Sequence, residues 1–351
     1  GGGMKAWRYG GYGAGGDPAA AIAALELAEA PVPKPGPGQV RVRVQYAAVN
    51  PIDFKLMGGG MHGICPVAFP CIPGFDFSGT IDAVGEGVQG LAAGDAVVAD
   101  SGLVETCRDP PPPQGCCGAF AERIVVPAAL VAAIGGGDAA ALAGLPLAGL
   151  TSYQALFTGA GADFKGGPLG DLQAGQKLLV LGGSTATGAF AVQLARHAGA
   201  RVAATASSKP APGGGTKLEA VRALGADQVI DYTATDWAEE LAGQEYDMIY
   251  DCVGDNADWR KAPRVLKKGG LFVSIANFTP TALDAEDARF ANFLVASDGG
   301  DLRKLVALVE EGKLKVAVDS VVPMAEVPAA LRRSMGGKCG GKIIIDVAGS
   351  A

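Results

Sequence analysis

The pattern of hydrophobic and polar residues changes near position 130 of this 351-residue chain. Before it, short apolar runs alternate with polar residues and are broken by glycines, as in residues 40–45, 73–88 and 118–127. Strands with one polar face and frequent turns predict a small, strongly curved antiparallel barrel. The stretch 10–24 has no clear period, so we expect a loop there.

The second half of the chain predicts a doubly wound parallel sheet. Residues 138–156 are rich in alanine and leucine and indicate a helix with a break at Pro146. Helical patterns at residues 217–224 and 259–266 then alternate with apolar runs, which is typical of an α/β fold. These runs, the expected strands, are residues 178–181, 201–207, 228–232, 248–253 and 271–276. The tail (a helix at 302–311, then β-like segments at 317–322 and 342–347) should return to the barrel.

Between Lys177 and Arg196, an apolar strand leads into a turn of small residues and then into a helix. Backbone N–H groups at the start of such a helix bind anions, usually a dinucleotide pyrophosphate. The turn is an imperfect Gly-x-Gly-x-x-Gly motif because Thr185 stands where the middle glycine belongs, so alone it could equally be structural. The expected cofactor-binding residues of the turn are Gly182, Ser184, Thr185, Ala186, Thr187 and Gly188.

Composition narrows the possible functions. Hydrophobic residues make up 49% and charged residues 19% of the chain, which is typical of a globular protein. The net charge of -7 argues against a nucleic-acid partner, and no apolar run approaches the ~18 residues that a membrane span needs. The seven cysteines form no regular framework, so reduced thiols are expected. No paired Cys-x-x-Cys motif supports Cys107, Cys116 and Cys117, so we expect no zinc.

Several short motifs, in order along nearly the whole chain, carry a family resemblance. They are residues 50–55 (Asn-Pro-Ile-Asp-Phe-Lys), 73–79 (Pro-Gly-Phe-Asp-Phe-Ser-Gly), 84–87, 94–95, 118–122, 145–151, the glycine turn, 224–227, 231–232, 251–254 (Asp-Cys-Val-Gly) and 341–342. With these motifs the chain resembles the medium-chain dehydrogenase/reductase superfamily, in its zinc-independent quinone oxidoreductase and enoyl reductase branch. Zinc-dependent relatives carry a cysteine near Asn50 and a His-Glu pair near Phe75 and Asp76, and these ligands are absent here.

The resemblance implies an α/β architecture of two domains with the active site in the cleft between them. A GroES-like antiparallel barrel, the catalytic domain, should comprise residues 4–145 and 281–351. A doubly wound parallel-sheet Rossmann domain that binds NADP should comprise residues 146–280. The resemblance also makes a homodimer possible, with an edge strand near residues 271–276 buried in it. It extends to cytosolic and plastid-envelope homologues, so the expected compartment is the cytoplasm or, alternatively, a plastid.

Cofactor preference follows from the end of the second strand of the nucleotide-binding unit. An NAD site usually has an acid there, which holds the ribose 2′-OH. This chain has Ser207, Ser208 and Lys209 instead, and hydroxyls with an ammonium suit a 2′-phosphate. Lys217 and Tyr232 match positions that contact this phosphate in NADPH-dependent relatives, so we expect NADPH. Both lysines could also be ordinary solvated lysines, and the insertion 210–215 could carry Lys209 away.

The resemblance places further residues around the nicotinamide half of the cofactor. Thr151 resembles a threonine near the nicotinamide amide, although a helix-capping role competes with this assignment. We expect Cys252 and Val253 to line the ribose pocket through their backbone rather than to react. The remaining expected cofactor-binding residues are Asn50, Ile275, Ala276, Asn277 and Lys342.

The expected catalytic residues are Asn50, Asp53 and Lys55. Asn50 could hold the nicotinamide ribose or a substrate carbonyl, whereas Asp53 could merely form an Asx-type turn. Lys55 stands where some quinone reductases have a tyrosine, and it could pair with Asp53, polarise a carbonyl or lie on the surface. The expected reaction is hydride transfer from NADPH to a small-molecule quinone or α,β-unsaturated carbonyl, with Lys55, a backbone N–H or water as proton donor. The alternative is a non-catalytic NADPH-binding sensor or structural protein of the same fold.

Overall fold

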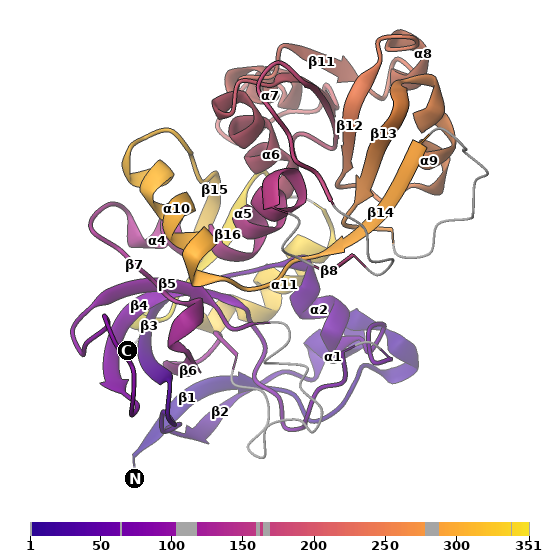
Figure 1. The fold of residues 1–351 in the computed structure, drawn as a ribbon. Coiled ribbons are helices and arrows are strands. Elements are labelled where there is room, and N and C mark those ends of the chain that lie inside the picture. Colours follow the sequence, from indigo (N-terminus) through magenta and orange to yellow (C-terminus); the bar gives the residue numbers. More distant parts are fainter. Residues whose placement is uncertain are drawn as a thin grey trace. The chain divides into compact units, whose positions relative to one another are not determined.

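The computed structural model describes residues 2–63, 65–102, 118–158, 162–163, 169–277, 288–337 and 339–350. Its contacts divide the chain into two units (Figure 1). The barrel unit comprises residues 1–147, 297–312 and 316–351, and the nucleotide unit comprises residues 148–296 and 313–315. The boundaries expected from the sequence, 4–145 and 281–351 against 146–280, differ from this division mainly at residues 288–296.

The barrel unit contains one antiparallel hairpin and one seven-stranded sheet. The hairpin pairs β1 (Gly3–Arg8) with β2 (Glu26–Pro31). The sheet has the order β15-β16-β3-β4-β5-β7, and β6 also pairs with β3. The strands of the sheet are β3 (Gln39–Ala48), β4 (Asp76–Val84), β5 (Ala96–Asp100), β6 (Arg123–Pro127), β7 (Ala132–Ala133), β15 (Val318–Pro323) and β16 (Lys342–Asp346).

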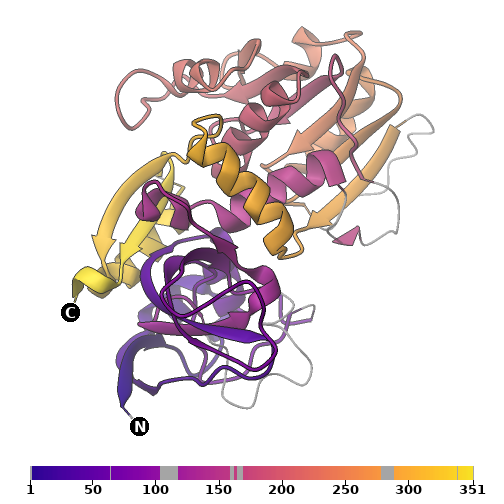
Figure 2. The same cartoon turned by 60° about the vertical axis from the view of Figure 1, so that its left-hand side comes forward.

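The tail of the chain returns to the barrel unit, as the sequence predicts. Strand β16 pairs antiparallel with β3 and parallel with β15. Figure 2 shows these C-terminal strands in yellow, with β15 at the edge of the sheet. Alternate residues of β3, such as Val40 and Val42, are fully buried and pack in one core with Ile345 of β16. The two ends of the chain therefore build a single hydrophobic core.

The described helices of the barrel unit run from 5 to 12 residues. They are α1 (Pro18–Ala23), α2 (Pro51–Met57), α4 (Ala139–Ala143), α10 (Gly299–Glu310) and α11 (Val327–Met335), with 3-10 turns at Ala14–Gly16, Ala128–Leu130, Met324–Glu326 and Ala348–Ser350. Helix α1 corrects the loop expected at residues 10–24. Asp17 caps it by accepting a hydrogen bond of 2.9 Å from the Ala19 N–H, and Pro18 occupies the first helical position, where its missing N–H costs nothing.

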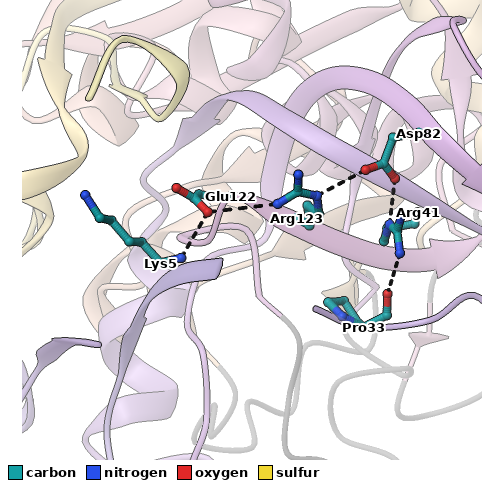
Figure 3. Close-up of polar contacts among 6 residues, drawn as sticks. All are labelled: Lys5, Pro33, Arg41, Asp82, Glu122 and Arg123. Atoms are coloured by element: carbon teal, nitrogen blue, oxygen red, sulfur yellow. Dashed lines mark hydrogen bonds and ion pairs between the residues drawn. The ribbon is translucent and has the colours of Figure 1, made fainter. Parts of the chain in front are cut away.

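A polar network covers the outer face of β3, β4 and β6 (Figure 3). The Asp82 carboxylate accepts from Arg41 Nε at 2.6 Å and from Arg123 Nε at 3.1 Å. Glu122 lies 4.0 Å from the Arg123 guanidinium and accepts from the Lys5 backbone N–H at 3.0 Å. These partly exposed pairs follow the polar positions of the alternating pattern, so they mark the solvent face of the sheet.

The nucleotide unit holds a second seven-stranded sheet, with the order β11-β10-β9-β12-β13-β14-β8. The strands pair in parallel except for β8, which is antiparallel to β14. Helices α6 and α7 lie on one side of the sheet and α9 on the other. The strands are β8 (Ala162–Asp163), β9 (Lys177–Leu181), β10 (Arg201–Ala206), β11 (Gln228–Asp231), β12 (Tyr246–Asp251), β13 (Leu266–Ser274) and β14 (Ala288–Leu294).

The helices of this unit begin with α5 (Pro146–Tyr153), so Pro146 starts a helix as its first residue. A π-helical turn (Gln154–Thr158) continues it. The others are α6 (Ala186–His197), α7 (Lys217–Ala223), α8 (Trp237–Glu240) and α9 (Asn256–Lys261), followed by a 3-10 turn (Ala262–Arg264). The expectation of an edge strand near residues 271–276 is wrong, because β13 pairs with β12 on one side and with β14 on the other.

Candidate active site and cofactor site

The glycine turn joins the end of β9 to the start of α6. Thr185 caps the helix, since its Oγ1 accepts the Gly188 N–H at 3.0 Å and donates to the Gly182 carbonyl at 2.8 Å. A side-chain hydroxyl thus closes the turn at the position where the motif has its middle glycine. The departure from Gly-x-Gly-x-x-Gly is therefore compatible with a tight strand-to-helix turn.

Two glycines of the turn are required by geometry. Gly182 has a φ of 85°, which is costly for any residue with a Cβ. A Cβ on Gly188 would lie 2.2 Å from the Gly182 carbonyl oxygen, so only glycine fits there. In the first turn of the 12-residue helix α6, the N–H groups of Ala186 and Thr187 receive no intrahelical partner. Half-buried Ser184 lies beside them. The turn can therefore hold an anion such as a pyrophosphate.

Thr205 on β10 holds the turn in place. Its Oγ1 accepts from the Gly182 N–H, and its carbonyl oxygen accepts from the Gly183 N–H, each at 2.9 Å. No motif had pointed to Thr205. The available signal was a single hydroxyl in the otherwise apolar stretch 202–206, where a buried hydroxyl needs a partner.

Past the end of β10, Ser207 is buried, Ser208 and Lys209 are exposed, and Lys217 is half-buried. The insertion 210–215 closes on itself, with the Ala211 N–H donating to the Gly215 carbonyl at 2.9 Å. The Lys217 N–H then donates to the Lys209 carbonyl at 2.9 Å. The insertion therefore does not carry Lys209 away, and the two lysines start from adjacent points of the backbone.

Two further side chains, those of Asp231 and Tyr232, lie at the end of the adjacent strand β11. Tyr232 is 56% exposed at the end of β11, so its ring is open to a ligand. The preceding Asp231 accepts hydrogen bonds from Thr233 Oγ1 at 2.6 Å and from the Thr233 N–H at 3.0 Å. These bonds, with further ones from Ser208, lower the pKa of Asp231. An ionised carboxylate therefore lies at Ser208, contributed by the neighbouring strand.

Thr151 is buried inside α5, so the expectation that it might cap a helix is wrong. The next residue, Ser152, donates to the Thr187 carbonyl at 2.8 Å, which ties α5 to the first turn of α6. Burial raises the pKa of Cys252 to about 12, while hydrogen bonds to Thr187 and Thr185 lower it by less. The Cys252 thiol is therefore protonated at neutral pH and a poor nucleophile.

Asp251 organises the carboxyl ends of β12 and β13. It accepts from the Val253 N–H at 2.8 Å and from Ser274 Oγ at 2.7 Å, and its carbonyl accepts from the Ile275 N–H at 3.1 Å. Ser274 Oγ in turn accepts from the Asn277 N–H at 3.0 Å. Val253 is 55% exposed, Ile275 and Ala276 are half-buried, and Asn277 is buried. These expected cofactor residues thus follow two adjacent parallel strands, where α/β sheets bind ligands.

The barrel unit brings Asn50 and Lys342 together on the carboxylate of Asp76. Lys342 Nζ lies 3.1 Å from Asp76 Oδ2, and Asn50 Nδ2 donates to the same oxygen at 2.9 Å. Lys342 also donates to Asn50 Oδ1. Asp76 Oδ1 accepts the Leu147 N–H at 2.9 Å. The pattern did not single out Asp76 as a site residue, although an acid between Phe75 and Phe77 in a buried strand was the available signal.

Asp53 and Lys55 lie on opposite faces of α2. Asp53 is 1% exposed and accepts the Asn50 backbone N–H at 2.8 Å, which caps the helix. Burial raises the pKa of Asp53 to about 8. Lys55 is exposed, and no ion pair joins it to Asp53 within the described part of the chain. Of the alternatives for Lys55, the structure disfavours pairing with Asp53, and Asp53 belongs to the Asn50–Asp76–Lys342 cluster instead.

Two family descriptions match the chain. Residues 36–136 match the "Alcohol dehydrogenase GroES-like domain" and residues 224–345 match "Zinc-binding dehydrogenase". A chloroplast envelope quinone oxidoreductase homolog of Arabidopsis thaliana is 31% identical over 98% of both chains. A 2-methylene-furan-3-one reductase of Solanum lycopersicum is 34% identical over 97% of this chain and 79% of its own. The chain belongs to the quinone oxidoreductase and enoyl reductase branch of the medium-chain dehydrogenase/reductase superfamily.

Solved structures of medium-chain dehydrogenases agree with this fold. The quinone oxidoreductase from Coxiella burnetii matches with a TM-score of 0.79 and 25% identity over 99% of this chain and 100% of its own. An NAD-dependent alcohol dehydrogenase matches with the same TM-score and 28% identity. The GroES-like barrel and the Rossmann-type parallel sheet expected from the sequence are thus confirmed.

The chain's potential metal ligands and its helices bear on zinc and on membranes. Among the described residues, no group of three or more His, Cys, Asp and Glu side chains could hold a metal ion. Cys107, Cys116 and Cys117 lie outside those residues. Cys65 is disulfide-bonded, which corrects the expectation that every thiol is reduced. None of the helices in the described ranges has the length and apolar character needed to cross a membrane.

Proposed function

We propose that this chain is an NADPH-dependent oxidoreductase that reduces quinones or α,β-unsaturated carbonyl compounds by hydride transfer without zinc. The observation that carries the proposal is the glycine turn, with two open N–H groups at a helix start and a pair of lysines past the next strand. The name of a further relative supports it, an NADPH-dependent alkenal/one oxidoreductase of Arabidopsis thaliana that is 34% identical over 91% of this chain.

The residues present fit the proposed cofactor. The turn from Gly182 to Gly188 would hold the pyrophosphate, because the missing Cβ at Gly188 lets the turn close tightly against the Gly182 carbonyl, with the N–H groups of the helix start left for the anion. Lys209, Lys217 and Tyr232 would hold the 2′-phosphate. The negative charge of Asp231 would repel that phosphate. The residues proposed for the nicotinamide half are Asn50, Thr151, Cys252, Val253, Ile275, Ala276, Asn277 and Lys342. When bound, NADPH supplies the hydride.

Lys342 is the best candidate for the group that polarises the substrate carbonyl. An ammonium has three N–H donors, and Lys342 uses two of them on Asn50 and Asp76. The third donor has no partner among the described residues and is available for an oxygen that gains negative charge, and a buried, fixed donor stabilises such charge strongly. The side-chain amide of Asn50 is already committed to Lys342 and Asp76, so its proposed part is to orient Lys342.

The test is stopped-flow absorbance at the NADPH band, in parallel with NADH, against a panel of quinones and α,β-unsaturated ketones. We expect NADPH oxidation with a clear preference over NADH, and the preferred acceptor separates quinone from enone chemistry. Tight NADPH binding without turnover would favour the sensor alternative. Binding of neither nucleotide would contradict the proposal.

Matched variants isolate the lysine pair. Lys217→Ala should raise KM for NADPH and leave KM for NADH unchanged. Lys34→Ala, which removes an exposed lysine from the barrel unit, should change neither KM. Equal KM changes for both nucleotides in Lys217→Ala would show that the lysine does not read the 2′-phosphate.

A further inference from the structure

Asp53 is a buried carboxyl group with one oxygen unused. Its Oδ2 accepts the Asn50 backbone N–H at 2.8 Å. Its Oδ1 is buried and has no hydrogen-bond partner in the structure as described. Leaving a charged carboxylate oxygen buried without a donor costs far more than leaving a neutral hydroxyl buried without a partner. The lack of a donor to Oδ1 among the described residues therefore favours the protonated form of Asp53.

Asp53 also lines a small cavity with a volume of about 10 Å³. The other walls come mainly from apolar side chains, including Leu56, Val67 and Phe75. A volume of roughly 10–15 Å³ is the minimum that one water molecule requires, so no larger solute can enter. Such surroundings offer Asp53 little solvation, and poor solvation disfavours the ionised form of a carboxyl group.

The charged groups that face Asp53 are Asp76 of β4 and Lys342 of β16, and the polar side chains of Tyr9 and Cys71 line the same cavity. Burial is the main reason why the pKa of Asp53 rises to about 8, and the charge of Asp76 raises it further. The Asn50 N–H and the charge of Lys342 lower it by less. With Asp53 protonated, the charges of Asp76 and Lys342 balance.

We propose that Asp53 is a positioning residue that carries a proton at neutral pH, keeps the cluster of Asn50, Asp76 and Lys342 electrically neutral, and so holds the Lys342 ammonium on Asn50 and Asp76. The inference rests on the proposed function, which assigns Asn50 and Lys342 to cofactor or substrate. Asp53 itself acts through these two residues and need not touch the reacting atoms.

Loss of the proton from Asp53 would change the cluster in a defined direction. A second buried carboxylate would attract the Lys342 ammonium away from Asn50 and Asp76, and it would draw water into the cavity. The ionised form exists above about pH 8. Turnover should therefore fall as pH rises through this value, because Lys342 no longer presents its free N–H in the same place.

The first experiment compares the pH dependence of kcat/KM for wild-type protein and Asp53→Asn. Asparagine has nearly the same shape, can still accept the Asn50 N–H through its Oδ1, and cannot ionise. We expect the alkaline fall of kcat/KM in the wild type to disappear in Asp53→Asn. The matched control is Asp138→Asn, an exposed helix cap in the same unit, which should keep the wild-type profile. An identical alkaline fall in Asp53→Asn would overturn the inference.

The second experiment needs no turnover. Between about pH 4 and pH 8 the unfolded chain releases the Asp53 proton while the folded chain keeps it, so folding stability falls as pH rises. The unfolding midpoint of the wild type should therefore drop relative to that of Asp53→Asn across this window. Parallel midpoints would show that Asp53 is ionised in the folded protein and would overturn the inference.

A third readout separates failure of this inference from failure of the proposed function. Amine-reactive labelling of Lys342, quantified by peptide mass spectrometry, should increase above pH 8 in the wild type more than in Asp53→Asn. If neither nucleotide supports turnover but the midpoints and the labelling differ as expected, Asp53 still positions Lys342 and only the proposed function fails. Equal labelling of both proteins would overturn the positioning role.

Discussion

At the scale of single residues, the decisive side chains are charged groups with unusual neighbours. The Asp76–Lys342 pair is buried to 0% and 4% side-chain exposure, where two charges persist only if each keeps its partner. Asp231 is a carboxylate beside Ser208, where we expect the 2′-phosphate of NADPH to bind. Asp76 could not be assigned from sequence spacing, because it meets Lys342 through strands that are far apart in the chain.

Removing one partner of the buried pair should be far more damaging than removing both. We expect Asp76→Leu alone to lower the free energy of unfolding by about 3–5 kcal/mol, because it leaves the Lys342 charge buried and unpaired. The double variant Asp76→Leu with Lys342→Met should recover most of that loss. Urea unfolding followed by circular dichroism measures both, and equal losses for the single and the double variant would contradict the view that the pair is fully desolvated.

Removing the Asp231 charge should favour the cofactor that carries a 2′-phosphate. In Asp231→Asn the side chain can still accept from Thr233, but it no longer repels a dianion. We expect KM for NADPH to fall roughly two- to fivefold, as is usual for one exposed charge, with KM for NADH unchanged. Steady-state kinetics with both nucleotides provide the check. Glu219→Gln, which removes the charge of the carboxylate that caps α7, provides a comparison for the effect of Asp231→Asn on KM.

At the scale of elements, strongly periodic segments were predictable and weakly periodic ones were not. Strands β9, β10 and β12 are apolar on both faces and were found within two residues of their ends. Strand β14 was missed, because Arg289 and Asn292 interrupt its apolar run and it is held by pairing with β13 on one side and β8 on the other. Helix α1 was missed because alanines and glycines hide the helical period, although Asp17 and Pro18 mark its start.

The cap of α6 makes a further prediction at this scale. Thr185→Ala should lower the free energy of unfolding by about 0.5–2 kcal/mol and raise KM for the nucleotide, because the Gly188 N–H loses its acceptor. Thr185→Gly, which restores the usual motif, should cost only a few tenths of a kcal/mol. Chemical denaturation and nucleotide titration measure the two effects. A larger loss for glycine than for alanine would argue against the capping role.

At the scale of the whole molecule, the C-terminal tail delivers Lys342 to the barrel. Strand β16 pairs with β3, so residues nearly the full chain apart meet in one sheet. Sequence patterning indicated that the tail returns to the barrel, but not that Lys342 meets Asn50 and Asp76, because contacts between distant segments leave no local trace. The family resemblance supplied Asn50 and Lys342 individually, and the structure joins them.

Weakening the tail should therefore reduce stability and activity together. Ile345 of β16 is fully buried, and Ile345→Ala should lower the free energy of unfolding by about 2–5 kcal/mol. Because Lys342 lies on the same strand, we also expect a lower kcat. Val321→Ala on the edge strand β15, where Val321 is 50% exposed, is the control and should change neither quantity appreciably. An unchanged kcat in Ile345→Ala would show that the position of Lys342 does not depend on the packing of the tail.

The self-closed insertion 210–215 has a practical consequence. Its first residue, Pro210, is bridged to Thr216 immediately after its last residue, and the Lys217 N–H donates to the Lys209 carbonyl just outside it. The number of residues between these contacts can thus change without moving either lysine. If Lys209 and Lys217 hold the 2′-phosphate as proposed, a small fluorescent reporter grafted there would stand beside the adenosine end of the nucleotide. Its emission could then follow nucleotide occupancy directly, without any coupled reaction.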